Sequence, residues 1–245
     1  TVTADNKTRI YGAANPSLTY SVAADGTGTS RALYSTDTLT GAVTTAATAT
    51  TNVGAASITQ GTLTNTNNGN YDITYNNGTL TINKATLTVT ADNQSRVYGD
   101  VNPSLSYTIT GYVNSQNLGS SGVTGSPTIS TTASAASNVN TYTITSAANN
   151  LAASNYDFSY VDGTLTVNRR PVTVTADAKT KIYGDANPTL TYTVAADGTA
   201  SSRGLYSTDA LTGSVVTTAT ALTGVGSVDI TQGGVTTANN ANYDI

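Results

Sequence analysis

Hydrophobic and polar residues alternate in short runs along most of this chain, which is the pattern of β-strands with one buried face. In the first third of the sequence the alternation is clearest over residues 18–22, 71–75 and 80–82. Further strand-like runs centre on Val2, Val43 and Ile58. The pattern therefore predicts a mainly β structure built from short strands.

Turn-forming residues separate these runs. Asn15-Pro16 interrupts the pattern after the first strand, because proline lacks a backbone donor and restricts the residue before it. Asn77-Gly78, and likewise Asp162-Gly163, lies between two alternating runs and predicts a β-hairpin, since both turn positions favour positive φ. Residues 30–39 (S-R-A-L-Y-S-T-D-T-L) are the stretch that most favours a helix, and at most a short one.

The same succession of runs occurs three times. The opening T-V-T-A-D strand and the Tyr-Gly pair after it recur, so that Asp5, Asp92 and Asp177 are equivalent and lie 87 and 85 residues apart. A period of that length indicates one small domain per repeat rather than a solenoid turn. We therefore expect domains at residues 1–84, 85–170 and 171–245, with the closing hairpin truncated in the third.

The repeats are of two types. Repeats one and three match without a gap at an offset of 172 residues and share L-Y-S-T-D, whereas repeat two has a different middle segment, which gives an A-B-A order. We expect each repeat to form a sheet of four or five strands with at most one short helix. An Ig-like β-sandwich is the alternative, but it needs about seven strands, and each repeat has five or six strand signals.

The composition excludes several classes of function. The 245 residues include no Cys, His, Met or Trp, and all 14 acidic residues are Asp. Most nucleophile–base pairs therefore cannot be built, and we expect no catalytic residue, metal site or cofactor. The net charge of −4 disfavours nucleic acid as a partner. No apolar run is long enough to insert this fragment into a membrane.

Two groups of polar residues remain as candidates for binding. Six aspartates recur at equivalent positions and could in principle hold Ca²⁺, although strand-end hydrogen bonding explains them as well; they are Asp5, Asp72, Asp92, Asp157, Asp177 and Asp244. Exposed tyrosines with neighbouring charges could instead contact glycan or protein. These weak candidates are Arg31, Tyr34, Asp37, Tyr112, Arg203, Tyr206 and Asp209.

One motif carries a resemblance to a known family. The Y-G-x-x-N-P turn after a T-V-T-A-D strand, followed later by N-Y-D and G-T-L-T-(I/V), resembles the MBG-type repeat of the YGX kind, over the whole chain except its last residues. Such repeats form arrays in large bacterial surface adhesins, including filamentous-haemagglutinin-like exoproteins of two-partner secretion systems. The resemblance implies β-grasp-like domains at the bacterial cell surface, as part of a longer exported protein.

This resemblance leads to two functional expectations. The first is a structural stalk that holds a distal binding region away from the cell. The alternative is an adhesive module that binds glycan, host or matrix protein, or associates with itself in aggregation or biofilm. Both joints between repeats, N-K-A and N-R-R-P-V, are short and not Gly/Ser-rich, so we expect them to be semi-rigid.

Overall fold

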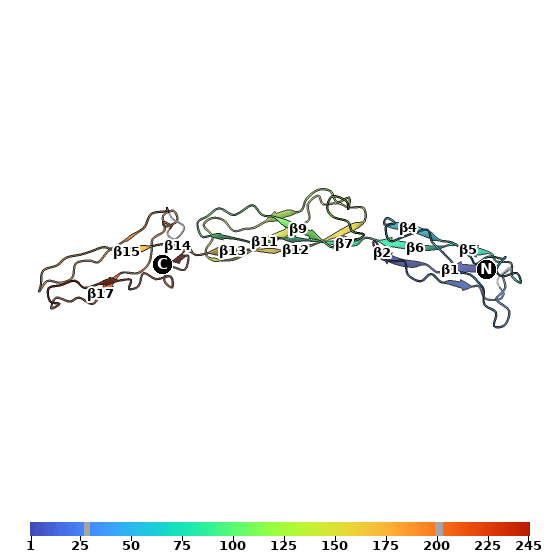
Figure 1. Ribbon diagram of the computed structural model, residues 1–245, viewed down its shortest axis with the longest axis horizontal. Coiled ribbons are helices and arrows are strands. Elements are labelled where there is room, and N and C mark those ends of the chain that lie inside the picture. Colours follow the sequence, from blue (N-terminus) through green and yellow to red (C-terminus); the bar gives the residue numbers. More distant parts are fainter. Residues whose placement is uncertain (27–29, 199–202) are drawn as a thin grey trace. The chain divides into compact units, whose positions relative to one another are not determined.

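The computed structural model describes residues 1–26, 30–198 and 203–245, and the chain falls into two compact units. The first unit comprises residues 1–90, 108–128 and 147–161, and the second comprises residues 91–107, 129–146 and 162–245. Within the described ranges all regular structure is β (Figure 1). The prediction of a mainly β chain is therefore confirmed.

The strands are short. In chain order they are β1 (Val2–Ala4), β2 (Lys7–Ile10), β3 (Tyr20–Val22), β4 (Gly54–Ile58), β5 (Tyr75–Asn76), β6 (Gly78–Asn83), β7 (Ala85–Ala91), β8 (Gln94–Val97), β9 (Tyr107–Thr110), β10 (Thr128–Ser130), β11 (Asn140–Ala147), β12 (Tyr156–Val161), β13 (Gly163–Asn168), β14 (Arg170–Pro171), β15 (Val174–Ala176), β16 (Tyr192–Val194), β17 (Val216–Thr217), β18 (Ile230–Thr231) and β19 (Tyr243–Asp244).

Repeat one divides its strands between two small sheets instead of forming one sheet of four or five strands. The first sheet has the order β3-β1-β5 and the second has the order β2-β6-β4. β1 runs parallel to β5, and β2 runs parallel to β6 with Lys7 opposite Leu80. Two extended segments, 2–10 and 75–83, thus run side by side and pass together from one sheet into the other.

The hairpin predicted at Asn77-Gly78 is wrong. The chain does not reverse there, because β5 and β6 both run parallel to the opening segment. Gly78 lacks the positive φ of a hairpin turn, and a Cβ on it would lie 2.7 Å from the carbonyl oxygen of Ala4. Glycine is needed because the backbones of the two segments come close where both pass from one sheet into the other, a place we call the crossing. The Thr79 N–H donates to Asn6 Oδ1 at 2.8 Å beside it.

Repeat two contains the same crossing. β12 pairs in parallel with β7, and β13 pairs in parallel with β8, so Asp162-Gly163 is not a hairpin turn either. A Cβ on Gly163 would lie 2.4 Å from the Ala91 carbonyl oxygen. The Thr164 N–H donates to Asn93 Oδ1 at 2.8 Å, which is the counterpart of the contact in repeat one.

Strands on both sides of the crossings supply the core. β6 alternates buried and exposed residues, and β7 buries Leu87 and Val89 completely. In the first unit Leu80, Ile58 and Leu63 are fully buried in one cluster. In the second unit Ile144 and Leu165 form the centre of a smaller cluster.

The helix predicted for residues 30–39 is also wrong. The segment is irregular and turns at Ser35, which has a φ of 55°. The Asp37 N–H donates to the Tyr34 carbonyl, while the Tyr34 N–H donates to the Tyr71 hydroxyl at 3.0 Å. A tyrosine from a distant segment thus satisfies a backbone donor that a helix would have used internally.

Candidate functional site: the joints between repeats

The first joint, between repeats one and two, is a cluster of aromatic rings. Tyr11 of the Tyr-Gly corner packs edge-to-face on Tyr156, with ring centroids 5.5 Å apart. Tyr112 packs on the other side of Tyr156 at 6.2 Å. Gly12 is close to Val113, since a Cβ added there would lie 2.4 Å from that side chain. The corner of one repeat therefore fits against the middle segment of the next.

Hydrogen bonds complete this joint. Asn155 accepts from the Val53 N–H at 3.0 Å and donates to Asn52 Oδ1 at 2.9 Å. Gln116 accepts hydrogen bonds from the hydroxyls of Tyr156 and Tyr11. The bonds of Asn155 and the Tyr11–Gln116 bond join residues about a hundred positions apart, so they tie repeat one to repeat two directly.

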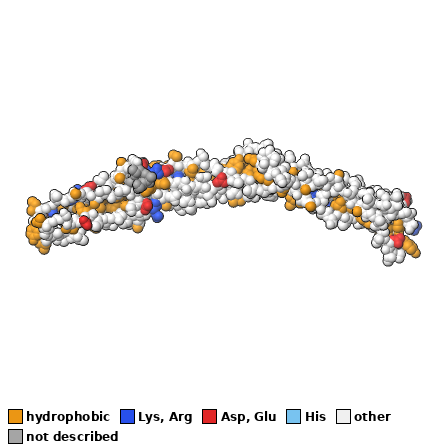
Figure 2. All heavy atoms as spheres, viewed as in Figure 1, with side chains coloured by type: hydrophobic (Ala, Val, Ile, Leu, Met, Phe, Trp, Pro, Cys, Tyr) orange, Lys and Arg blue, Asp and Glu red, His pale blue; other side chains and the backbone are white. Residues whose placement is uncertain are grey.

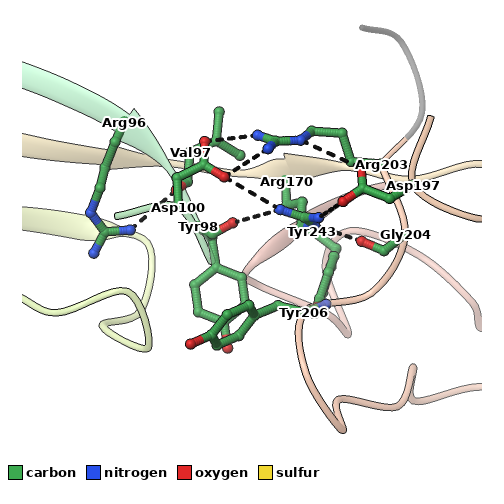
Figure 3. Close-up of polar contacts among 10 residues, drawn as sticks. All are labelled: Arg96, Val97, Tyr98, Asp100, Arg170, Asp197, Arg203, Gly204, Tyr206 and Tyr243. Atoms are coloured by element: carbon green, nitrogen blue, oxygen red, sulfur yellow. Dashed lines mark hydrogen bonds and ion pairs between the residues drawn. The ribbon is translucent and has the colours of Figure 1, made fainter. Parts of the chain in front are cut away.

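The second joint, between repeats two and three, uses the same plan (Figure 3). Tyr98 packs edge-to-face on Tyr206 at 5.4 Å and on Tyr243 at 5.7 Å. The hydroxyls of Tyr98 and Tyr243 both donate to Asp209 Oδ2. Asn242 has the role of Asn155, because it accepts from the Val139 N–H at 2.9 Å and donates to Asn138.

Charged residues distinguish the second joint from the first. The Arg203 guanidinium binds both carboxylate oxygens of Asp100, at 2.7 and 2.8 Å. Arg170, in the linker, lies 2.7 Å from Asp197 and also contacts Asp100 and the Tyr98 carbonyl (Figure 3). The Arg170 side chain is only 6% exposed, so pairing with carboxylates compensates a charge that is otherwise costly to bury.

The environment of the second joint raises the pKa of two of its tyrosines. Burial, together with the hydrogen bond to Asp209, raises the pKa of Tyr243 well above its ordinary value. Burial and the same carboxylate raise the pKa of Tyr98. Both effects favour the neutral phenol, which is the form that can donate to the carboxylate. The cluster is thus intact at neutral pH.

The structure separates the predicted binding residues into three groups. Arg203, Tyr206 and Asp209 lie within the second joint. Tyr112 lies in the first joint. The equivalents in repeat one are Arg31, Tyr34 and Asp37, and they lie on its surface, with the Tyr34 side chain 80% exposed. Asp37 accepts from Tyr71, which repeats the Asp209–Tyr243 contact. Glycan or protein contact through these residues stays a prediction.

The sequence pattern did not identify three residues of the joints, which are Asn155, Arg170 and Asn242. Asn155 and Asn242 precede the tyrosine of each N-Y-D motif, and this recurrence was the available signal. Arg170 gave no signal because a linker arginine next to a proline is expected to be solvated. Its burial depends on Asp100 and Asp197, which are distant in sequence.

The recurring aspartates accept hydrogen bonds from hydroxyl groups of neighbouring segments. Asp5 accepts from the Thr19 hydroxyl, Asp92 from the Ser106 hydroxyl, and Asp177 from Thr191 and Thr193. The two hydroxyl donors lower the pKa of Asp177. Among the residues that the structure describes, no three acidic side chains come together as a metal-binding group.

The repeats, the Tyr-Gly corners and their joints agree with a known family. Residues 1–81, 87–166 and 172–245 each match the MBG domain of the YGX type. The chain belongs to the MBG domain family. No curated protein and no solved structure matches it. MBG repeats are structural, adhesin-type modules of extracellular proteins, not enzymes.

The described part of this MBG array contains no helix that is long and apolar enough to cross a membrane. Its joints have packed rings, satisfied hydrogen bonds and paired charges. These contacts fix one repeat against the next. Arg31, Tyr34 and Asp37 are equivalent to the joint residues Arg203, Tyr206 and Asp209, but they form an exposed face of repeat one.

Proposed function

We propose that this MBG array is a spacer segment of a surface-attached bacterial adhesin, which holds a distal binding region away from the cell. The observation that carries the proposal is that neighbouring repeats are joined by packed interfaces. Edge-to-face rings link Tyr11 with Tyr156 and Tyr98 with Tyr243. A spacer transmits distance only when its joints resist bending, and a flexible linker alone would not provide that resistance.

The linkers support the same function. In the first joint the Tyr11 N–H donates to the Asn83 carbonyl, and the Tyr98 N–H donates to the Asn168 carbonyl in the second. The corner that contacts the next repeat is therefore hydrogen-bonded to the linker that leads into it. Bending at a joint would have to break this bond, the ring contacts and the asparagine pair together.

Distance measurements across the second joint test the proposal. The chain has no Cys, so spin labels can be placed at Ser104→Cys and Thr218→Cys, which are exposed on either side of this joint. We expect a narrow distance distribution in pulsed electron paramagnetic resonance. The Asp209→Ala variant should broaden it, because Asp209 binds Tyr98 and Tyr243.

The matched control for this experiment is Asp229→Ala, which removes an exposed carboxylate of the same repeat outside the joint. It should leave the distribution unchanged. A broad distribution in the unaltered chain would contradict the spacer function. A response to added Ca²⁺ or to a chelator would show that the recurring aspartates bind metal, and we expect no such response.

An adhesive function is the second candidate, and the exposed face of repeat one favours it. Tyr34 is 80% exposed, whereas its counterpart Tyr206 packs on Tyr98. An exposed tyrosine flanked by Arg31 and Asp37 provides a ring and charges that sugars or protein side chains can contact. If this face is adhesive, Tyr34→Ala should abolish binding on a glycan array or to matrix proteins, while Tyr160→Ala should not.

A further inference from the structure

In repeats one and two a single strand fills the same position between two neighbours. β6 lies between β2 and β4, and β13 lies between β8 and β11. Leu80 of β6 is opposite Lys7 on one side and Ala56 on the other, and Ile82 is opposite Arg9 and Gly54. Both apolar side chains are almost completely buried. The strand therefore supplies the core and also pairs with both neighbours.

Repeat three has counterparts of the two flanking strands, β2 and β4, with a groove between them. The counterparts of β2 and β4 are residues 179–182 and 226–230, and nearly all of these residues lie outside regular strands. The groove has a volume of about 550 Å³ and is lined by residues from both segments, including Lys179, Lys181, Gly226 and Val228. These four residues are equivalent to the residues that flank Leu80 and Ile82 in repeat one.

Apolar side chains on this groove are exposed to solvent. Tyr183, which lines the groove, is 60% exposed. Val228 is 41% exposed, and Val225 is 99% exposed. Hydrophobic side chains gather on the part of the molecule that carries β15 and β17 (Figure 2). An open groove with partly apolar walls, between two extended segments whose counterparts in repeat one are strands, is suited to binding an extended chain.

We propose that the groove of repeat three is a strand-binding site, and that its occupant is an extended segment with the pattern Gly-Thr-Leu-Thr-Ile-Asn. The filled positions in repeats one and two define its direction and register. The strand runs parallel to residues 179–182 and antiparallel to residues 226–230. Its leucine lies opposite Lys179 and Val228, and its isoleucine lies opposite Lys181 and Gly226. The proposal does not depend on the spacer function.

A synthetic peptide provides the first test. The probe is Asn-Gly-Thr-Leu-Thr-Ile-Asn-Lys, blocked at both ends and added to the full chain. We expect saturable one-to-one binding by calorimetry, with amide shifts confined to the groove in ¹H–¹⁵N spectra. A control peptide with serine in place of leucine and isoleucine should not bind, because it has no apolar side chain to bury. Equal binding of the two peptides, or none, would overturn the proposal.

Two matched variants of the protein locate the site. Val228→Asp places a charge on the groove wall and should weaken binding at least about tenfold, since the leucine loses its apolar contact. Val216→Asp is the control, because Val216 is similarly exposed at 46% and lies outside the groove. Both variants are first compared with the parent chain by circular dichroism. Equal loss of binding in both, or in neither, would refute the assigned site.

The direction of the strand is tested with a spin label on the peptide. A label at its amino end should broaden the amide signals of Asp177 and Ala178, and a label at its carboxyl end should broaden that of Ile182. The reverse result would exclude the parallel register. A dimer of the chain that excess peptide does not dissociate would assign the groove to a second copy instead, and would overturn the proposed occupant.

Discussion

Arg9 and Arg96 are buried residues that each satisfy three oxygen atoms with one guanidinium. Arg96 donates to Asn102 Oδ1 at 2.8 Å, to the Val97 carbonyl at 3.1 Å and to the Ser134 carbonyl. Repeat three has Lys181 at this position, and its ammonium reaches two carbonyls, those of Asp185 and Thr220. A planar guanidinium can hold three loop acceptors in fixed directions, whereas an ammonium on a flexible stem cannot.

Arg96→Met should therefore destabilise repeat two by roughly 2 kcal/mol, because buried acceptors lose their donor. Arg96→Lys should cost less, since the lysine of repeat three already fills this position. Urea unfolding followed by near-ultraviolet circular dichroism measures both. Lys181→Arg is the reciprocal control, and it should stabilise repeat three. Equal stability of the methionine and lysine variants would contradict this role of the guanidinium.

Tyr98 and Tyr243 of the second joint should lose their hydroxyl protons at a higher pH than exposed tyrosines do. Burial and Asp209 raise the pKa of Tyr98 and Tyr243 above the ordinary value of 10.0. Folding thus favours the neutral phenols, so their contribution to stability is complete below pH 10 and is lost as the pH rises through the raised pKa values. Absorbance at 295 nm should show a delayed class of tyrosines.

Asp209→Asn should lower the pKa of this delayed class while leaving part of the shift, because burial is the larger cause for both residues. Asp229→Asn, in the same repeat but outside the joint, should change nothing. A single titration step near pH 10 for all tyrosines would show that the cluster is open to solvent.

At the level of elements, the crossing of paired parallel segments defines the repeat. Hydrophobic alternation correctly located β6 and β13 and the buried side chains on them. It could not give their direction, because a run with period two looks the same whether the chain reverses or continues. Asn-Gly and Asp-Gly suggested a reversal, since glycine before an alternating run is the usual signal of a turn. At Gly78 the glycine instead allows a close approach to Ala4.

Gly78→Ala should therefore destabilise repeat one by about 2 kcal/mol, because the added methyl group would overlap backbone atoms that cannot easily move. Gly69→Ala is the matched control in the same repeat, since Gly69 has no heavy atom within 4 Å of an added Cβ and no positive φ. It should be neutral or slightly stabilising. Thermal unfolding of the two variants checks the difference, and equal melting temperatures would contradict the crossing.

The joints were predictable only in part. The shared L-Y-S-T-D segment indicated Tyr206 and Asp209 as candidates, and both lie in an interface. The same segment suggested a helix in repeat one. The positive φ of Ser35, which its counterpart Ser207 shares, excludes that helix. Arg170 was not predictable, because its role depends on a partner in another repeat, and the recurrence of N-Y-D was the one signal for the asparagines. Sequence patterns report local periodicity, whereas an interface between repeats depends on contacts across about a hundred residues.

At the level of the whole molecule, the two joints provide controls for each other. Trypsin can cut after Lys84 in the first linker and after Arg169 in the second, and Arg169 is exposed. Asp100→Ala removes the nearer of two carboxylate partners of Arg203 and one partner of Arg170. Cleavage after Arg169 should therefore accelerate by about tenfold as the second joint opens more often.

Cleavage after Lys84 is the internal reference in the same digest and should keep its rate. Mass spectrometry of the fragments over time separates the two sites. Acceleration at both linkers would indicate a general loss of stability, and an unchanged rate at Arg169 would show that the charge cluster does not hold this joint closed.

The charge cluster also affects how such an array can change in length over generations. The corner of repeat one is Tyr11-Gly12-Ala13, and that of repeat two is Tyr98-Gly99-Asp100, so only the second offers Arg203 a carboxylate. Recombination that removed repeat two would place Ala13 opposite Arg203 and leave the arginine with Asp197 as its remaining carboxylate partner. Neighbour order therefore matters at this joint, because an aspartate corner gives Arg203 a carboxylate and an alanine corner does not.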